Sequence, residues 1–398
     1  MSLLRAANGF ERIHNGIYQR GRTGEVPLLP TDLAELESMA LAALQPEHAG
    51  YLNGGAGRGR TVATNRGAFD RLELTPAVLN NVAHRDHATT LCSTRMAAPV
   101  FVSPMGGLSL AHPDADTAIV RAAAERGVPT AISPMACTRV EDLARAAPDS
   151  VRWMELLWHN NDAVIDSMLA RAQESGIDTL IIGVDLPTLG WRPAALDHAY
   201  LPFLHGVGAT NILTDPAFLA MMNNPQDHDE RARRWSELSA DASRTWESLE
   251  RLRARWRGPL IVKGLQRPSD ARRAVNAGAD AVFVSNHGGR QVDGAAATLS
   301  LLPAIVDEID GDVPVLVDGG VRSGADVVMA LALGADAVGL GRLVLWGLTV
   351  AGQDGVGHVL DCVLAEMDAT IANLGVASAQ DLRAADVVRE YSGERSIC

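Results

Sequence analysis

Short apolar segments alternate with longer amphipathic segments along most of the chain from Pro99 onward. The apolar segments are rich in Val, Ile and Leu, which is typical of parallel strands that are buried on both faces. Eight such segments lie at residues 99–106, 128–135, 151–158, 179–186, 259–264, 281–288, 314–320 and 337–342. Amphipathic segments at 114–126, 162–174, 246–257 and 324–333 predict helices that connect them. The pattern therefore predicts repeated β–α units.

Eight units favour a closed (β/α)₈ barrel, the TIM barrel. An open doubly wound sheet is the alternative, but it normally has fewer strands and a Gly-rich turn after the first strand, which Met105-Gly106-Gly107 does not match. We expect one domain over residues 1–398, with a barrel at 99–375 and a C-terminal tail at 376–398. Residues 1–98 would form an N-terminal cap with a helix at 32–44, and residues 191–244 a long, partly helical lid insertion after the fourth strand.

Composition narrows the class of protein. The chain is 47% hydrophobic and 21% charged, as in ordinary globular proteins, and its net charge of −13 disfavours binding to nucleic acids or anionic membranes. No apolar run approaches the roughly 20 residues that span a bilayer, and no signal peptide is recognisable, so we expect a cytoplasmic protein. The cysteines lack CxxC spacing and are expected to be reduced thiols: Cys92, Cys137, Cys362 and Cys398.

Polar residues stand at the carboxyl ends of the apolar segments, where active sites of (β/α)₈ barrels form. They are Glu155, Asp185, Lys263, Ser285 with His287, Asp318 and Arg342. Any one of them could belong to a structural ion pair instead. Six strand ends of this kind around one barrel predict a site whose neighbouring charges shift pKa values and support acid–base chemistry.

His287 is the best candidate for a general base because an imidazole accepts a proton near neutral pH, although a structural histidine is the alternative. Asp185 could orient its ring and stabilise the charged form. Arg290 and Arg192 could form a fork that binds a carboxylate. These residue types together predict proton abstraction from a small carboxylic acid.

The last two strand ends predict a phosphate site. Asp318-Gly319-Gly320-Val321-Arg322 and Gly339-Leu340-Gly341-Arg342 combine glycines with arginines, and loops after the seventh and eighth strands often bind phosphate in such barrels. Glycines permit close approach of the backbone, and arginines add charge-assisted hydrogen bonds. A Gly-rich turn without the arginines would indicate only a loop.

The most specific motif is SNHGGRQ at 285–291, accompanied by Lys263-Gly264, by DGGVRSG at 318–324 and by LALGADAVGLGR at 331–342. On these motifs the chain resembles, over nearly its whole length, the FMN-dependent 2-hydroxy acid oxidases and dehydrogenases. Residues 15–30 and 192–218, the latter with WRP, PFL and TNILTDP, are most similar to lactate 2-monooxygenase. The resemblance implies FMN as cofactor without a metal, oxidation of an (S)-2-hydroxy acid to the 2-keto acid, molecular oxygen as acceptor and a homotetramer. Oxidative decarboxylation would follow if the likeness to the monooxygenase extends to chemistry.

The resemblance also implies roles for individual residues. His287 and Asp185 would be the base and its partner, and Lys263 would stand beside flavin N1 and O2, where a cation stabilises the reduced ring. Tyr51, Arg192 and Arg290 would bind substrate. Cofactor contacts would come from Met105, Gly106, Ser133 and Ser285 near the isoalloxazine, and from Asp318, Gly320, Arg322, Gly341 and Arg342 near the ribityl phosphate.

Three positions depart from the family pattern. Glu155 replaces a Gln and Gly183 a Thr at the flavin pyrimidine edge, while Leu157 replaces a Tyr that contacts substrate. A negative Glu155 would oppose flavin reduction, so we expect either a raised pKa for this residue or a lowered flavin potential. The departures indicate drift, with Trp158 or His159 compensating, or a changed and bulkier substrate. A non-redox phosphate-binding isomerase and an FMN-binding protein without turnover remain alternative functions.

Overall fold

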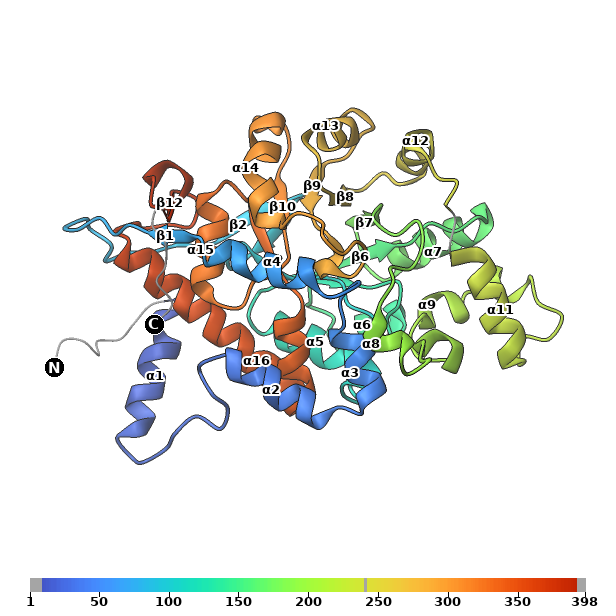
Figure 1. Cartoon of the computed structure of the whole chain (residues 1–398), viewed down its shortest axis with the longest axis horizontal. Helices are drawn as coiled ribbons and strands as arrows, with labels where there is room; N and C mark the ends of the chain where they lie inside the picture. The colour runs from blue at the N-terminus through green and yellow to red at the C-terminus, as the bar shows by residue number, and fades with distance from the viewer. Residues whose placement is uncertain (1–8, 240–241, 392–398) are drawn as a thin grey trace.

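The computed structural model describes residues 9–239 and 242–391 (Figure 1). Eight parallel strands close into a barrel, with β4 to β11 in sequential order and β11 paired back to β4. The strands are β4 Val100–Val102, β5 Thr130–Ile132, β6 Arg152–Leu156, β7 Leu180–Gly183, β8 Leu260–Leu265, β9 Ala281–Val284, β10 Val315–Val317 and β11 Ala337–Leu340. Each lies inside a predicted apolar segment or reaches one residue past it, so the predicted (β/α)₈ fold is confirmed.

The barrel interior is filled by large side chains. Phe101 packs against Trp153 at 5.2 Å and against Phe283 at 5.3 Å between ring centroids. Leu91 and Met96 join this cluster from a hairpin, β2 Thr89–Leu91 and β3 Thr94–Met96. The cluster leaves no room for a ligand at the end of the barrel that the hairpin joins. The space for a ligand therefore lies at the opposite end, where the strands have their carboxyl ends.

Amphipathic helices cover the outside of the barrel. They are α5 Ala115–Ala124, α6 Val140–Ala146, α7 Asp162–Glu174, α12 Trp246–Arg255, α13 Pro268–Asn276, α14 Thr298–Ile309, α15 Gly324–Ala332 and α16 Arg342–Asn373. In α7 the side chain of Asn161 caps the first turn by accepting backbone N–H bonds from Ala163 and Val164. The helices predicted at 114–126, 162–174, 246–257 and 324–333 are confirmed as α5, α7, α12 and α15.

The N-terminal cap contains α1 Glu11–Gly21, α2 Ala34–Ala43, α3 Pro46–Asn53, α4 Arg60–Phe69 and β1 Leu72–Leu74. The predicted helix at 32–44 is α2. The segment 376–398 is not a separate tail in its described part, because η5 Arg383–Ala385 leads to β12 Val388–Glu390, which pairs antiparallel with β1 (Figure 1). Pairing between segments so distant in the chain leaves no local sequence signal, and the cap and the segment after α16 share one small sheet.

The insertion after β7 is partly helical, as predicted, with α8 Pro193–Leu196, η3 Pro202–His205, α9 Thr210–Leu213, α10 Pro216–Leu219 and α11 His228–Ser239. It is anchored to α7, where Asp215 accepts hydrogen bonds from Ser167 Oγ at 2.8 Å and from Arg171 Nη1 at 3.1 Å. Phe203 packs between Trp235 of the insertion and Tyr51 of the cap. The insertion therefore packs against the cap through Phe203.

Within the described ranges, none of the helices combines the length and the apolar character needed to cross a bilayer. Cys92, Cys137 and Cys362 are free thiols, in line with the expected reduced state, and Cys398 lies outside the described residues.

Asp368 of α16 ties the cap to the barrel. It accepts bonds from Arg85 Nε at 2.8 Å and Nη2 at 2.9 Å, and its Oδ1 lies 2.8 Å from His87 Nε2. Burial opposes ionisation, but Arg85 and His87 outweigh it and lower the pKa of Asp368 to about 2. The carboxylate thus stabilises the fold above its unfolded pKa of about 3.9, and this contribution is lost as the pH falls toward 2.

Asp368→Asn should therefore lower the free energy of unfolding by about 2 kcal/mol at pH 7. The difference from the unsubstituted protein should shrink between pH 4 and pH 2. Urea titrations across this range measure both quantities, with the exposed Asp149→Asn as control. A difference that stays constant with pH would show that the charge of Asp368 is not responsible.

Candidate active site

A cavity opens at the carboxyl ends of the barrel strands. About 1090 Å³ of empty space lies within it, including the solvent at its open mouth. Of the predicted site residues it is lined by Tyr51, Met105, Gly106, Ser133, Glu155, Leu157, Arg192, Lys263, His287, Arg290, Asp318, Gly320, Arg322, Gly341 and Arg342. Gly183, Asp185 and Ser285 are not part of the lining and lie behind it.

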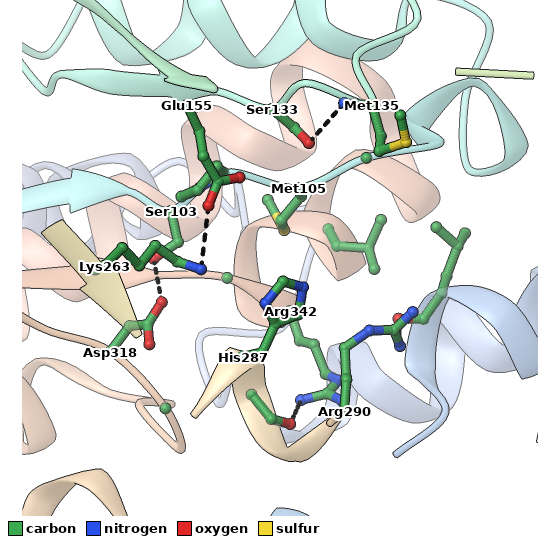
Figure 2. A pocket seen from close by; sticks show the side chains of 18 of the residues that line it. Ser103, Met105, Ser133, Met135, Glu155, Lys263, His287, Arg290, Asp318 and Arg342 are labelled. Carbon is green, nitrogen blue, oxygen red and sulfur yellow. Dashed lines mark hydrogen bonds and ion pairs between the residues drawn. The ribbon is translucent and has the colours of Figure 1, made fainter. Parts of the chain in front are cut away.

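His287 projects into the cavity from the loop after β9 (Figure 2). Its backbone is left-handed, with φ 56°, and its N–H donates to Ser285 Oγ at 3.1 Å. A left-handed conformation is costly for a residue other than glycine and is retained mostly where a site requires it. Ser285 is fully buried, so it holds this turn in place and does not face the cavity.

Asp185 holds the imidazole from behind. Its Oδ1 lies 3.1 Å from His287 Nδ1. Burial favours the neutral acid, but Lys263 and His287 outweigh it and lower the pKa of Asp185 to about 2. The ionised carboxylate therefore accepts the Nδ1 proton, which leaves Nε2 of His287 as the nitrogen that can accept a proton from a ligand. The predicted pair of base and orienting acid is brought together.

Lys263 and Glu155 form an ion pair inside the cavity, with Nζ 3.2 Å from Oε1 (Figure 2). Both residues are buried. Burial lowers the pKa of Lys263, but the charges of Glu155, Asp185 and Asp318 outweigh this effect and raise it. Glu155 thus has a cationic partner, an arrangement that sequence reasoning had left open.

Gly183 makes room for this ion pair. A Cβ atom at position 183 would stand 3.3 Å from Glu155 Oε1, which is closer than nearly all real contacts of a Cβ. The strand β7 that carries Gly183 lies between β6 and β8, which carry Glu155 and Lys263. The departures at 155 and 183 are therefore neighbours in the barrel, and the contact of Gly183 with the cofactor stays a prediction.

Arg290 and Arg192 lie together on the cap side of the cavity. Arg290 donates to Gly54 O at 2.6 Å and Tyr51 O at 2.7 Å, and Arg192 Nε donates to Arg290 O at 2.9 Å. Burial and the neighbouring Arg290 lower the pKa of Arg192 to about 9. Neither guanidinium has a carboxylate partner among the described residues, so both favour a bound anion.

Arg342 and Arg322 also line the cavity. Arg342 Nη1 donates to Gly288 O at 2.9 Å, whereas its Nε and Nη2 are buried without a partner. Burial, together with Arg290 and Arg322, lowers the pKa of Arg342 to about 9. The Arg322 guanidinium stacks 4.5 Å from the centre of the Trp346 ring. Unsatisfied buried donors with excess positive charge fit the phosphate of a bound molecule.

The glycine turn after β10 lines the same cavity. Gly319 and Gly320 have φ 105° and 88°, and a Cβ on Gly320 would overlap Asn65 O of α4. Asp318 Oδ1 is buried without a partner and could accept a bond from a ligand hydroxyl. A phosphate at the arginines, hydroxyls at Asp318 and a planar ring toward Ser133 and Lys263 would together match FMN. The residues present therefore fit this cofactor.

Sequence reasoning missed several residues of the cavity. Ser103 donates to Asp318 Oδ2 at 3.0 Å and so positions this acid. Met135 and Leu186 add apolar wall. Ser103 stands just after β4, at the strand-end position that had identified the charged residues, whereas Met135 and Leu186 resemble ordinary core residues in the sequence.

Comparisons with known proteins agree with this site. The sequence profile of the FMN-dependent dehydrogenase family matches residues 40–389. An FMN-dependent alpha-hydroxy acid dehydrogenase of Penicillium citrinum is 38% identical over 88% of this chain and 89% of its own length. The L-lactate oxidase of Lysinibacillus sphaericus is 34% identical, over 92% of this chain and 95% of the relative.

Solved structures give the same result. The crystal structure of mandelate oxidase with (S)-4-hydroxymandelic acid superposes with a TM-score of 0.81 and 34% identity, covering 92% of this chain and 99% of that one. The predicted fold, cofactor and family are thus confirmed. The chain belongs to the FMN-dependent dehydrogenase family and is an FMN-dependent oxidoreductase.

Proposed function

We propose that this protein oxidises an (S)-2-hydroxy acid to the 2-keto acid, with molecular oxygen as the final electron acceptor. The observation that carries the proposal is the His287–Asp185 pair in one cavity with the two arginines Arg192 and Arg290. A base and a carboxylate fork are what a 2-hydroxy acid requires. Relatives named L-lactate oxidase and 2-hydroxyacid oxidase add weight to this reaction.

The side chains divide the work between binding and proton transfer. Arg192 and Arg290 bind the substrate carboxylate, and Tyr51, whose pKa is raised by burial, stays protonated and donates a hydrogen bond from its hydroxyl group to the same ligand. His287 takes the proton of the 2-hydroxyl group at Nε2, and Asp185 stabilises the resulting imidazolium through Nδ1. Bound FMN supplies an acceptor for the α-hydrogen and both electrons of the C–H bond.

The wall of the cavity favours an apolar substrate side chain. Leu157 is 7% exposed and stands with Leu186 and Met135 among the lining residues. Leu157 occupies the place where the family has a Tyr, so it removes a hydroxyl and adds apolar surface. We therefore propose a 2-hydroxy acid with a side chain larger than the methyl group of lactate.

An anaerobic screen of 2-hydroxy acids against bleaching of the bound flavin tests the reaction and the substrate class. (S)-2-Hydroxy-4-methylpentanoate should give a kcat/KM at least about tenfold above that of (S)-lactate, because each buried methylene contributes about 0.8 kcal/mol. Leu157→Tyr should reduce this preference. Absence of bleaching by any 2-hydroxy acid would contradict the proposal.

Product analysis in air tests the fate of the keto acid. Hydrogen peroxide with the 2-keto acid is the expected result. Carbon dioxide with an acid one carbon shorter would instead identify oxidative decarboxylation of the lactate 2-monooxygenase type.

A further inference from the structure

The charged groups of the cavity are divided into two regions. One side carries Lys263 with the carboxylates Glu155 and Asp318, and the other carries Arg290 and Arg342 (Figure 2). The arginines have no carboxylate partner among the described residues, whereas Lys263 is paired at 3.2 Å. Lys263 is therefore a neutralised cation, whereas Arg290 and Arg342 are not neutralised by a carboxylate among the described residues.

The position of this pair follows from the fit of FMN. The phosphate belongs at Arg342, whose Nε and Nη2 are buried without partners, and the reacting end of the cofactor belongs near His287. With the phosphate at the arginines, the ring occupies the part of the cavity that Ser133, Lys263 and Glu155 line. The ion pair thus lies within the region that must hold the redox-active ring.

We propose that Glu155 sets the reduction potential of bound FMN by neutralising Lys263. Two-electron reduction at neutral pH brings two electrons and one proton to the ring, which thereby gains one negative charge. An unpaired ammonium beside the ring would stabilise that charge. A carboxylate 3.2 Å from the ammonium cancels most of its field, so the oxidised form is favoured and the potential is lower.

Burial and the small residue at position 183 also bear on this ion pair. Glu155 is 4% exposed and Lys263 is 3% exposed, so water screens their charges little. Gly183 leaves the space that the Glu155 carboxylate occupies, since a Cβ there would crowd Oε1. Glu155 is therefore paired with Lys263 in a buried position, and a side chain at 183 would require its carboxylate to shift by a few tenths of an ångström.

The test is an anaerobic redox titration of the bound flavin against a reference dye. Glu155→Gln keeps the size of the side chain and removes its charge. It should shift the equilibrium toward reduced flavin by at least tenfold, which corresponds to a rise of about 30 mV for a two-electron couple. Glu155→Asp, which keeps the charge, should stay closer to the unsubstituted protein than Glu155→Gln does.

Glu230→Gln is the matched control, because Glu230 is a buried carboxylate of the insertion that bonds to backbone N–H groups of Asn223 and Asn224. Its flavin potential should be unchanged. An unchanged or lower potential in Glu155→Gln, or an equal shift in Glu155→Asp, would overturn the proposal. The titration reduces the flavin chemically and needs no hydroxy acid, so its failure is distinguishable from failure of the proposed function on which the inference rests.

Discussion

His287→Gln should slow substrate-dependent reduction of the bound flavin by about 10³-fold or more while the protein keeps its FMN. Glutamine can still form hydrogen bonds but cannot take a proton near neutral pH, so the 2-hydroxyl proton has no acceptor at the position of Nε2. Asp185, whose pKa of about 2 keeps it ionised, is then left without the imidazolium that it stabilises. Anaerobic stopped-flow absorbance at saturating hydroxy acid measures the effect directly.

His84→Gln is the control for this substitution, because His84 is exposed and outside the cavity lining. Its reduction rate should equal that of the unsubstituted protein. The flavin spectrum before mixing shows whether each variant holds its cofactor. Fast reduction in His287→Gln would remove His287 from the role of base, and the proton would then need another acceptor among the lining residues.

The strands were predictable because the barrel buries both of their faces, which leaves continuous apolar segments in the sequence. Their ends were less predictable. The first segment was expected to reach Gly106, but β4 ends at Val102, and Pro104, Met105 and Gly106 line the cavity. Residues that line a ligand cavity are often apolar, as strand residues are. Hydrophobicity alone therefore cannot separate the last residue of a strand from the first residue of a ligand site.

The polar residues of the site were located by the same strand-end rule, and the pair of His287 with Asp185 was expected, but the pair of Glu155 with Lys263 was not. Glu155 and Lys263 belong to strands separated by β7, and a Cβ on Gly183 between them would stand 3.3 Å from Glu155 Oε1. The bond of Arg290 to the cap carbonyls of Gly54 and Tyr51 likewise joins distant segments. A sequence shows which end of a strand a charge occupies, but side-chain partners across the barrel require the three-dimensional arrangement.

Arg342→Gln should weaken FMN binding by about two powers of ten. Arg342 Nε and Nη2 are buried without a partner, and truncating one member of a buried charge pair typically costs about 3 kcal/mol. Riboflavin lacks the phosphate, so its affinity should change little. Fluorescence titrations of the cofactor-free protein with FMN and with riboflavin give both constants.

The comparison of the two flavins separates phosphate binding from general support of the cavity. If Arg342 only held the loop through its bond to Gly288 O, the variant would lose affinity for FMN and riboflavin equally. The exposed Arg389→Gln serves as control and should leave both constants unchanged. Because an unpaired buried guanidinium destabilises the protein without cofactor, Arg342→Gln should also be at least as stable as the unsubstituted protein when FMN is removed, and less stabilised when FMN is added.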